Sequence, residues 1–217
     1  KILSPQELAP KTGFWNGNSG RYGLILHGII SVIRDRVSRL PVGLQSHINR
    51  VEEIAVQLSD SNGVDPELGR LGALCHDVAR AMPDIELLSR ASDMNLQICN
   101  VERNIPMLLH GPVGSEIVRT EDGVDDESIL NAVYWHTTGS DSLDEIGKIV
   151  FLADKLDPEK NKKYPYQKYL HDLADSNLDL AMFEFLRREV DNLMQGNNEV
   201  HPRMLESRDY YSQLVQG

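Results

Sequence analysis

Apolar residues recur at three- and four-residue spacing from Ile29 onward, a period typical of amphipathic helices. The pattern over 44–58 stops at the turn-forming sequence Asp60–Gly63, and Pro66 then opens another helix. The same spacing predicts further helices over 84–92, 108–119, 126–138, 142–156, 166–175 and 178–195, and a last one from Pro202 to about Leu214. No segment shows the alternation of a strand. The pattern therefore predicts an all-α protein.

The first 25 residues differ from the rest because they are rich in Gly, Asn and Pro. We expect an irregular N-terminal arm over 1–25, followed by one helical domain over 26–217. Phe14 and Trp15 would pack the arm onto the body or present it to a partner. Within the domain, Ser142 and Glu145 have the spacing of a capping box, which predicts a helix that begins there.

Composition narrows the class of protein. The 217 residues suffice for one core, and a formal net charge of −11 argues against nucleic-acid binding, which needs a clustered positive surface. The apolar run Gly23–Ile33 is too short and too interrupted to span a membrane. Two cysteines, Cys75 and Cys99, cannot form a disulfide framework and suit a reducing compartment. No signal peptide is recognisable. We expect a cytoplasmic protein that binds neither nucleic acid nor membranes.

Ionisable residues interrupt several of the apolar helical segments. Any one such histidine is more often a hydrogen-bonded core residue than a ligand, and His27 and His171 are read that way. Several chemically matched residues in the same apolar context favour a shared cation, because burying them without partners would cost several kcal/mol each. These residues are His47, His76, Asp77, His110, His136 and Asp154.

The order His…His-Asp…Asp resembles the HD-domain metal-dependent phosphohydrolases. The segments LCHDVARAMP, LLHGPVGSEI, ILNAVYWHTTG, KIVFLADKLDP and HPRMLESR narrow the resemblance to the YqeK-type family, over about 40–211. It implies an HD-domain helical bundle and symmetrical hydrolysis of diadenosine tetraphosphate to two ADP. Two alternatives stay open: another HD-domain hydrolase of dNTPs or nucleoside monophosphates, and a helical module that senses a nucleotide without turnover.

Carried over residue by residue, the resemblance implies specific roles. One or two divalent ions, usually iron with manganese or cobalt as alternatives, would be held by His47, His76, Asp77 and Asp154. The catalytic residues would be Asp77, His110 and His136. The ion would lower the pKa of a bound water, and the imidazoles would offset phosphoryl charge or donate a proton. The substrate would be contacted by Arg80, His110, His136, Thr137, Asp154, Lys160, His201, Pro202 and Arg203.

This chain departs from the family at some of these positions. Arg80 stands where the family usually has lysine, and Lys160 stands where it usually has arginine, which alters the geometry of donors to phosphate. Arg203 would bind phosphate at a helix N-terminus, or instead form a surface salt bridge with Glu206. Trp135 is a core residue or a wall of the pocket. A homodimer is open, although no heptad stripe indicates one.

Overall fold

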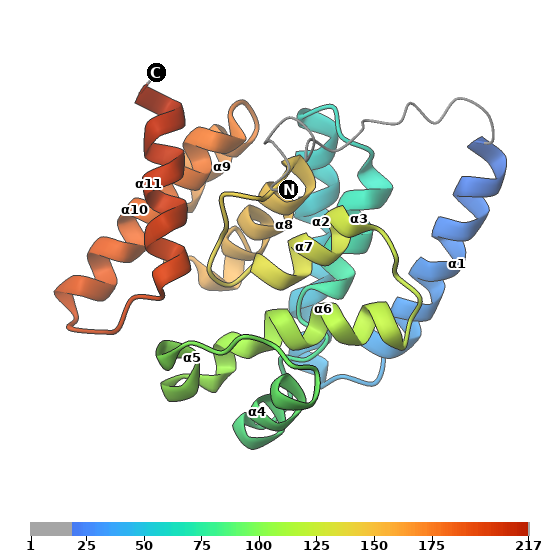
Figure 1. Cartoon of the computed structure of the whole chain (residues 1–217). Coiled ribbons are helices and arrows are strands. Elements are labelled where there is room, and N and C mark those ends of the chain that lie inside the picture. The colour runs from blue at the N-terminus through green and yellow to red at the C-terminus, as the bar shows by residue number, and fades with distance from the viewer. Residues whose placement is uncertain (1–18, 217) are drawn as a thin grey trace, which may run out of the picture.

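In this computed structural model the described residues, 19–216, form helices and connecting loops with no strand among them, so the predicted all-α class is confirmed (Figure 1). None of the described helices is long and apolar enough to cross a membrane. The α-helices are α1 (Ser19–Val37), α2 (Val42–Ser61), α3 (Pro66–Cys75), α4 (Asp84–Asp93), α5 (Asn100–Asn104), α6 (His110–Thr120), α7 (Glu127–Trp135), α8 (Glu145–Lys155), α9 (Gln167–Ala174), α10 (Leu178–Gln195) and α11 (Pro202–Gln216). Two 3-10 helices are η1 (Pro106–Leu109) and η2 (Pro158–Lys160).

Helices α2, α3, α7 and α8 pack against one another in the middle of the molecule. Figure 1 shows α9, α10 and α11 on one side of this group, α1 on the other, and α4, α5 and α6 along one end. The interior between α8 and α10 is closed by Phe151 and Phe185, whose rings meet edge to face at 5.4 Å. The buried Tyr211 hydroxyl of α11 donates to the Ser140 carbonyl at 3.2 Å. These contacts hold the C-terminal helices against the central group.

The start of α8 differs from the predicted capping box. Helix α8 begins at Glu145, and the Asp144 side chain caps it by accepting from the Gly147 backbone N–H at 2.9 Å. The backbone N–H of Ser142 donates instead to the Ser140 hydroxyl at 3.1 Å, within the preceding turn. The predicted box at Ser142 and Glu145 is therefore wrong, because an aspartate two residues later competes successfully for the cap.

Residues 19–25 differ from the irregular structure predicted for them. Helix α1 begins at Ser19, so residues 19–25, expected to be irregular, are helical. A glycine costs a helix up to about 1 kcal/mol, but the stripe of Leu26, Ile30 and Ile33 buries against the core and offsets that cost. Phe14 and Trp15 lie outside the described residues. The division of the chain into an arm and a domain stays a prediction.

Candidate metal centre

The ends of several helices and the interior of α2 bring the six predicted ionisable residues together. Two of the histidines directly follow the last residue of a helix, where the chain turns toward the interior: His76 after α3 and His136 after α7. A third, His110, is the first residue of α6. The remaining donors come from α2, which carries His47, and from the last turn of α8, which carries Asp154. All of them meet around Asp77.

The Asp77 carboxylate lies at the middle of this cluster. One oxygen, Oδ1, lies 3.0 Å from His110 Nε2 and 3.4 Å from His136 Nε2. The other, Oδ2, lies 3.4 Å from the Nε2 atoms of both His47 and His76. A single buried carboxylate thus faces four imidazoles from four parts of the chain.

Asp154 closes the other side of the cluster. Its Oδ1 lies 3.0 Å from His47 Nε2 and 3.7 Å from His76 Nε2. Two donor groups result within this cluster, His47 with His76 and Asp154, and Asp77 with His110 and His136, and in each group the ligand atoms lie within 4.8 Å of one another. Two adjoining groups of three donors suit one or two ions.

Each of the four imidazoles points its Nε2 atom inward, because its Nδ1 atom is held from behind. Carbonyl and carboxylate oxygens can only accept hydrogen bonds, so Nδ1 carries the proton of each neutral imidazole, and Nε2 of that form presents a lone pair. Such outer partners are the usual way of orienting histidine ligands. The acceptors are Ala73 O for His76 at 2.6 Å, Val133 O for His136 at 2.7 Å, Met107 O for His110, and Asp157 Oδ2 for His47 at 2.5 Å.

When the four imidazoles are neutral, their Nε2 lone pairs and the carboxylate oxygens therefore face one another inside the cluster. The Nε2 atoms of His110 and His136 are 2.9 Å apart, although neither has a proton to offer. Buried His76 Nε2 and both Asp77 oxygens have no hydrogen-bond partner among the described residues. A cation resolves this repulsion, and imidazole nitrogen with carboxylate oxygen is a donor set that transition-metal ions accept. The residues fit a metal centre.

The charges of the cluster shift the pKa values of its members. Burial alone would raise the pKa of Asp77, but the surrounding imidazoles, His76 first, hold it well below its usual range. Burial would likewise lower the pKa of His76, yet the two carboxylates outweigh it and raise that pKa to about 9. Burial, aided by the neighbouring imidazoles, lowers the pKa of His136 to about 3. Without a metal, His76 therefore takes up a second proton, on Nε2, beside the two carboxylates.

A pH dependence of stability follows for the metal-free protein. The His76 pKa of about 9 lies above its ordinary value of 6.5, so its protonation stabilises the fold fully below pH 6.5 and is lost as the pH rises through 9. The lowered pKa of His136 changes the stability only below about pH 6.5, where the unfolded chain takes up a proton that the folded protein does not. We expect the chelator-treated protein to lose on the order of 2 kcal/mol between about pH 7 and pH 9. Denaturant unfolding at several pH values, with His76→Gln as the comparison, measures this, and a stability that is constant or rises would contradict it.

Three cations surround the cluster. The buried Lys155 ammonium donates to Asp154 Oδ2 at 2.6 Å and to the His136 carbonyl at 2.9 Å, and burial lowers its pKa. Lys160 pairs with Asp154 from η2. Arg80 lies with its Nε 3.7 Å from Asp77 Oδ2. Arg80 and Lys160 were predicted as site residues, whereas Lys155 was not. Its signal in the sequence is a lysine enclosed in the apolar run KIVFLADKLD.

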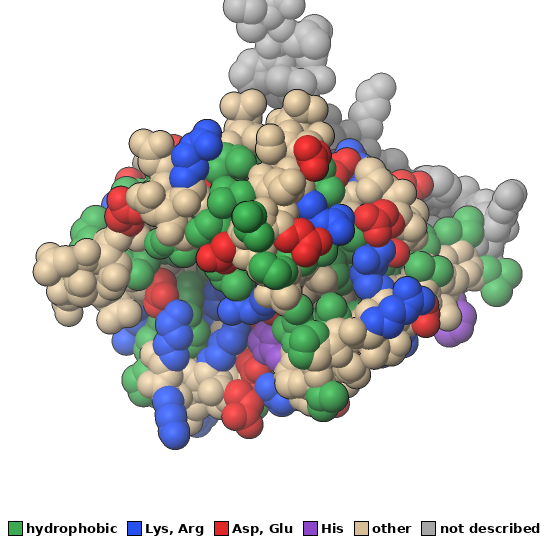
Figure 2. Space-filling model, turned by 90° about the horizontal axis from the view of Figure 1, so that it is seen from below, with side chains coloured by type: hydrophobic (Ala, Val, Ile, Leu, Met, Phe, Trp, Pro, Cys, Tyr) green, Lys and Arg blue, Asp and Glu red, His purple; other side chains and the backbone are tan. Residues whose placement is uncertain are grey.

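A cavity of about 360 Å³ opens onto this centre. Figure 2 shows that face of the molecule, with a histidine side chain deep in a hollow and Lys and Arg side chains gathered around it. The predicted residues that line the cavity are Arg80, His110, His136, Thr137, Asp154, Lys160 and His201. Apolar wall residues that the sequence analysis did not identify include Ile105, Met107, Leu108, Tyr164, Phe185 and Met204.

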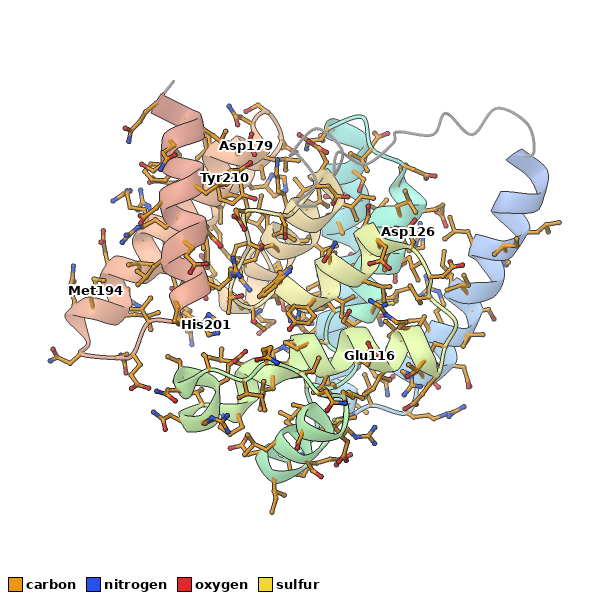
Figure 3. The ribbon with its side chains drawn as sticks, viewed as in Figure 1. Glu116, Asp126, Asp179, Met194, His201 and Tyr210 are labelled. Carbon is orange, nitrogen blue, oxygen red and sulfur yellow. The ribbon has the colours of Figure 1, made fainter. Side chains whose placement is uncertain are left out.

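The start of α11 contributes one predicted residue to the cavity and leaves two outside it. His201, labelled in Figure 3 at the start of this helix, lines the cavity. Its Nε2 atom lies 3.5 Å from Glu102 Oε1 and 3.5 Å from Cys99 Sγ. Pro202 and Arg203 are not among the lining residues. Arg203 instead pairs with Glu206 at 2.9 Å, and its guanidinium lies 5.1 Å from the Trp135 ring centroid. The surface salt bridge that the sequence analysis kept as an alternative is the arrangement observed.

Asp157 is a positioning residue that the pattern did not reveal. It is buried, accepts a hydrogen bond from His47 Nδ1, and forms a two-point ion pair with Arg50 at 2.6 and 2.9 Å.

We expect Asp157→Ala to weaken metal affinity roughly 10- to 100-fold, because His47 loses the acceptor that fixes its ring. Metal titration against a competing chelator measures this. Asp157→Asn should lose less, since its amide oxygen still accepts, and Arg50→Ala should bind metal as wild type does. Equal losses in all three would contradict a role through His47.

The fold and the site define an all-helical protein whose buried histidine and aspartate side chains form a cluster that fits a metal ion. A family model described as HD domain matches residues 44–159, more than half of the chain, and the chain belongs to this family, as its resemblance predicted.

Two relatives of the chain carry the same name. The chain is 29% identical over 171 residues to "Bis(5'-nucleosyl)-tetraphosphatase, symmetrical" of Bacillus subtilis (strain 168), with 79% of this chain and 89% of the relative covered. It is 30% identical over 173 residues to the protein of the same name from Halalkalibacterium halodurans, with 78% and 87% covered.

A solved structure has the same fold. It is described as a predicted HD superfamily hydrolase involved in NAD metabolism from Clostridium acetobutylicum, and it matches with a TM-score of 0.76 and 24% identity over 89% of this chain and 97% of that one. This likeness supports the fold alone.

Proposed function

We propose that this protein hydrolyses diadenosine tetraphosphate symmetrically and releases two molecules of ADP. The observation that carries the proposal is the cation-rimmed cavity over a cluster that fits a metal, in a chain whose relatives bear the name of this activity. Related dinucleoside polyphosphates belong to the same substrate class. The protein is then a metal-dependent hydrolase of acid anhydrides.

The metal ligands in this proposal are His47, His76, Asp77 and Asp154, with iron as the first expectation and manganese or cobalt as alternatives. When bound, the metal supplies a Lewis acid and lowers the pKa of a coordinated water. His110 and His136 face the same carboxylate, Asp77, from the cavity side. A second ion would use these two imidazoles as its ligands.

The chain's own cations act on the tetraphosphate. Lys160 and Arg80 line the cavity beside the cluster and offset the charge of phosphate oxygens there. Lys155 holds the Asp154 carboxylate in place through its ammonium. His110 and His136 lie beside the phosphoryl group that is attacked. His110 Nε2, which presents a lone pair, accepts the proton of the attacking water and passes it to the leaving oxygen. Thr137, on the cavity wall, donates a further hydrogen bond to phosphate.

The apolar part of the cavity suits a nucleoside. Tyr164, Phe185 and Met204 form one wall, and Met107 and Leu108 of η1 form another. Adenine is flat and largely apolar, so it gains from burial between such walls. His201 lies beside this wall and contacts the nucleoside or its nearest phosphate.

Product analysis tests the proposal. The protein is loaded with iron or manganese and incubated separately with diadenosine tetraphosphate, ATP, dGTP and AMP, and the products are resolved chromatographically. ADP as the sole product from diadenosine tetraphosphate supports the proposal. Turnover of dGTP or AMP instead would favour another HD-domain hydrolase, and binding without turnover of any of the four would favour a nucleotide sensor.

A further inference from the structure

A second hollow lies on the His47 side of the metal-ligand cluster. It encloses about 400 Å³ between the start of α2 and the segment that follows Asp77, and its walls include Gly43, Leu44, His47 and Ala81. The first cavity lies on the His110 and His136 side and contains neither the α2 residues nor Ala81. The centre therefore has space on both of its faces.

Two cations belong to both spaces. Arg80 and Lys160 line the first cavity and also the second hollow. Both also approach the cluster carboxylates, Arg80 toward Asp77 and Lys160 toward Asp154. A polyphosphate that runs from one space to the other would cross between these cations and pass the metal ligands at its middle.

The shape of the substrate requires such an arrangement. Diadenosine tetraphosphate consists of two identical halves, and release of two ADP means that the reacting bond lies at the middle of the chain. The two nucleosides must therefore lie on opposite sides of the metal centre. The first cavity, at about 360 Å³, is at the lower end of the range for a small-molecule site and suits one nucleotide rather than two.

We propose that the hollow beside Gly43 binds the second nucleoside of a dinucleoside polyphosphate, an inference that rests on the proposed function. Leu44 offers an apolar contact, and the Arg80 guanidinium can stack on an aromatic base. Gly43 leaves room for the base, because a Cβ atom at this position would meet no heavy atom within 4 Å. The hollow thus explains selection of a substrate with two nucleosides.

The test fills the hollow without touching the metal ligands. Gly43→Trp places an indole in open space, so the fold tolerates it. We expect its KM for diadenosine tetraphosphate to rise roughly tenfold, the effect of losing a few pocket contacts, while the inhibition constant of ADP changes less than twofold. Val42→Trp is the matched control, because Val42 is exposed and does not line the hollow. This control should change neither quantity.

A second variant and two outcomes decide the result. Ala81→Phe fills the hollow from its opposite wall and should act as Gly43→Trp does. An unchanged KM in both variants would overturn the inference, and so would a parallel rise in the inhibition constant of ADP, which would place the first nucleotide in this hollow. If wild-type protein fails to cleave diadenosine tetraphosphate at all, the proposed function fails, a result distinct from either outcome.

Discussion

Asp77→Ala is expected to abolish both metal binding and hydrolysis. Its two oxygens face all four inward-pointing imidazoles. Its removal therefore takes away the ligand that lies between the histidines of the two donor groups. We expect activity on diadenosine tetraphosphate to fall about a thousandfold or more, because several kcal/mol of transition-state stabilisation depend on the metal. Elemental analysis of the purified variant and chromatography of its products measure the two effects.

The same variant should keep its helices. Asp77 follows α3 and caps no helix, so far-UV circular dichroism should match that of the wild type. Adding metal should raise the melting temperature of the wild type but not of the variant, because only a protein that binds the ion in its folded state is stabilised by it. Asp60→Ala, an exposed carboxylate on α2, is the control and should behave as wild type. Retained metal and turnover in Asp77→Ala would refute the assigned centre.

The sequence predicted the helices and the inner donors because both leave a periodic signal. A histidine or aspartate within an apolar helical segment must be buried, and several such residues together require a shared partner. His47, His110 and Asp154 were identified in this way. The sequence could not show that each imidazole is fixed from behind by an acceptor, because that depends on where the helix ends place the backbone carbonyls.

Residues that act through tertiary contacts were missed for the same reason. Asp157 follows α8 like an ordinary loop aspartate, and only the packing of η2 against α2 makes it the partner of His47 and Arg50. Arg203 stands at a helix N-terminus and pairs with Glu206 one turn later, and its contact with phosphate stays a prediction. The apolar walls of the cavity are helical core positions in the sequence, and nothing local marks them as binding residues.

Gly111→Ala is expected to destabilise the fold. Gly111 lies in α6 next to His110, where α6 crosses the last turn of α7. A Cβ atom there would lie 2.7 Å from the Tyr134 carbonyl oxygen and 3.0 Å from that of Val133. Both obstacles are backbone atoms, so the two helices must move apart. Overpacking of this kind costs about 1–3 kcal/mol, which lowers the melting temperature by several degrees in a chain of this size.

The displacement should also reach the metal centre, because the Val133 carbonyl is the acceptor that orients His136, and His110 precedes the substituted residue. We therefore expect Gly111→Ala to lose metal affinity together with stability. Gly114→Ala, one turn later in α6, is the matched control. Its Cβ atom would meet only side chains at 3.4 Å or more, and alanine favours a helix over glycine by about 1 kcal/mol. Its melting temperature should stay the same or rise, with metal affinity unchanged. Equal behaviour of the two variants in thermal denaturation and metal titration would show that the close approach at Gly111 does not position the histidines.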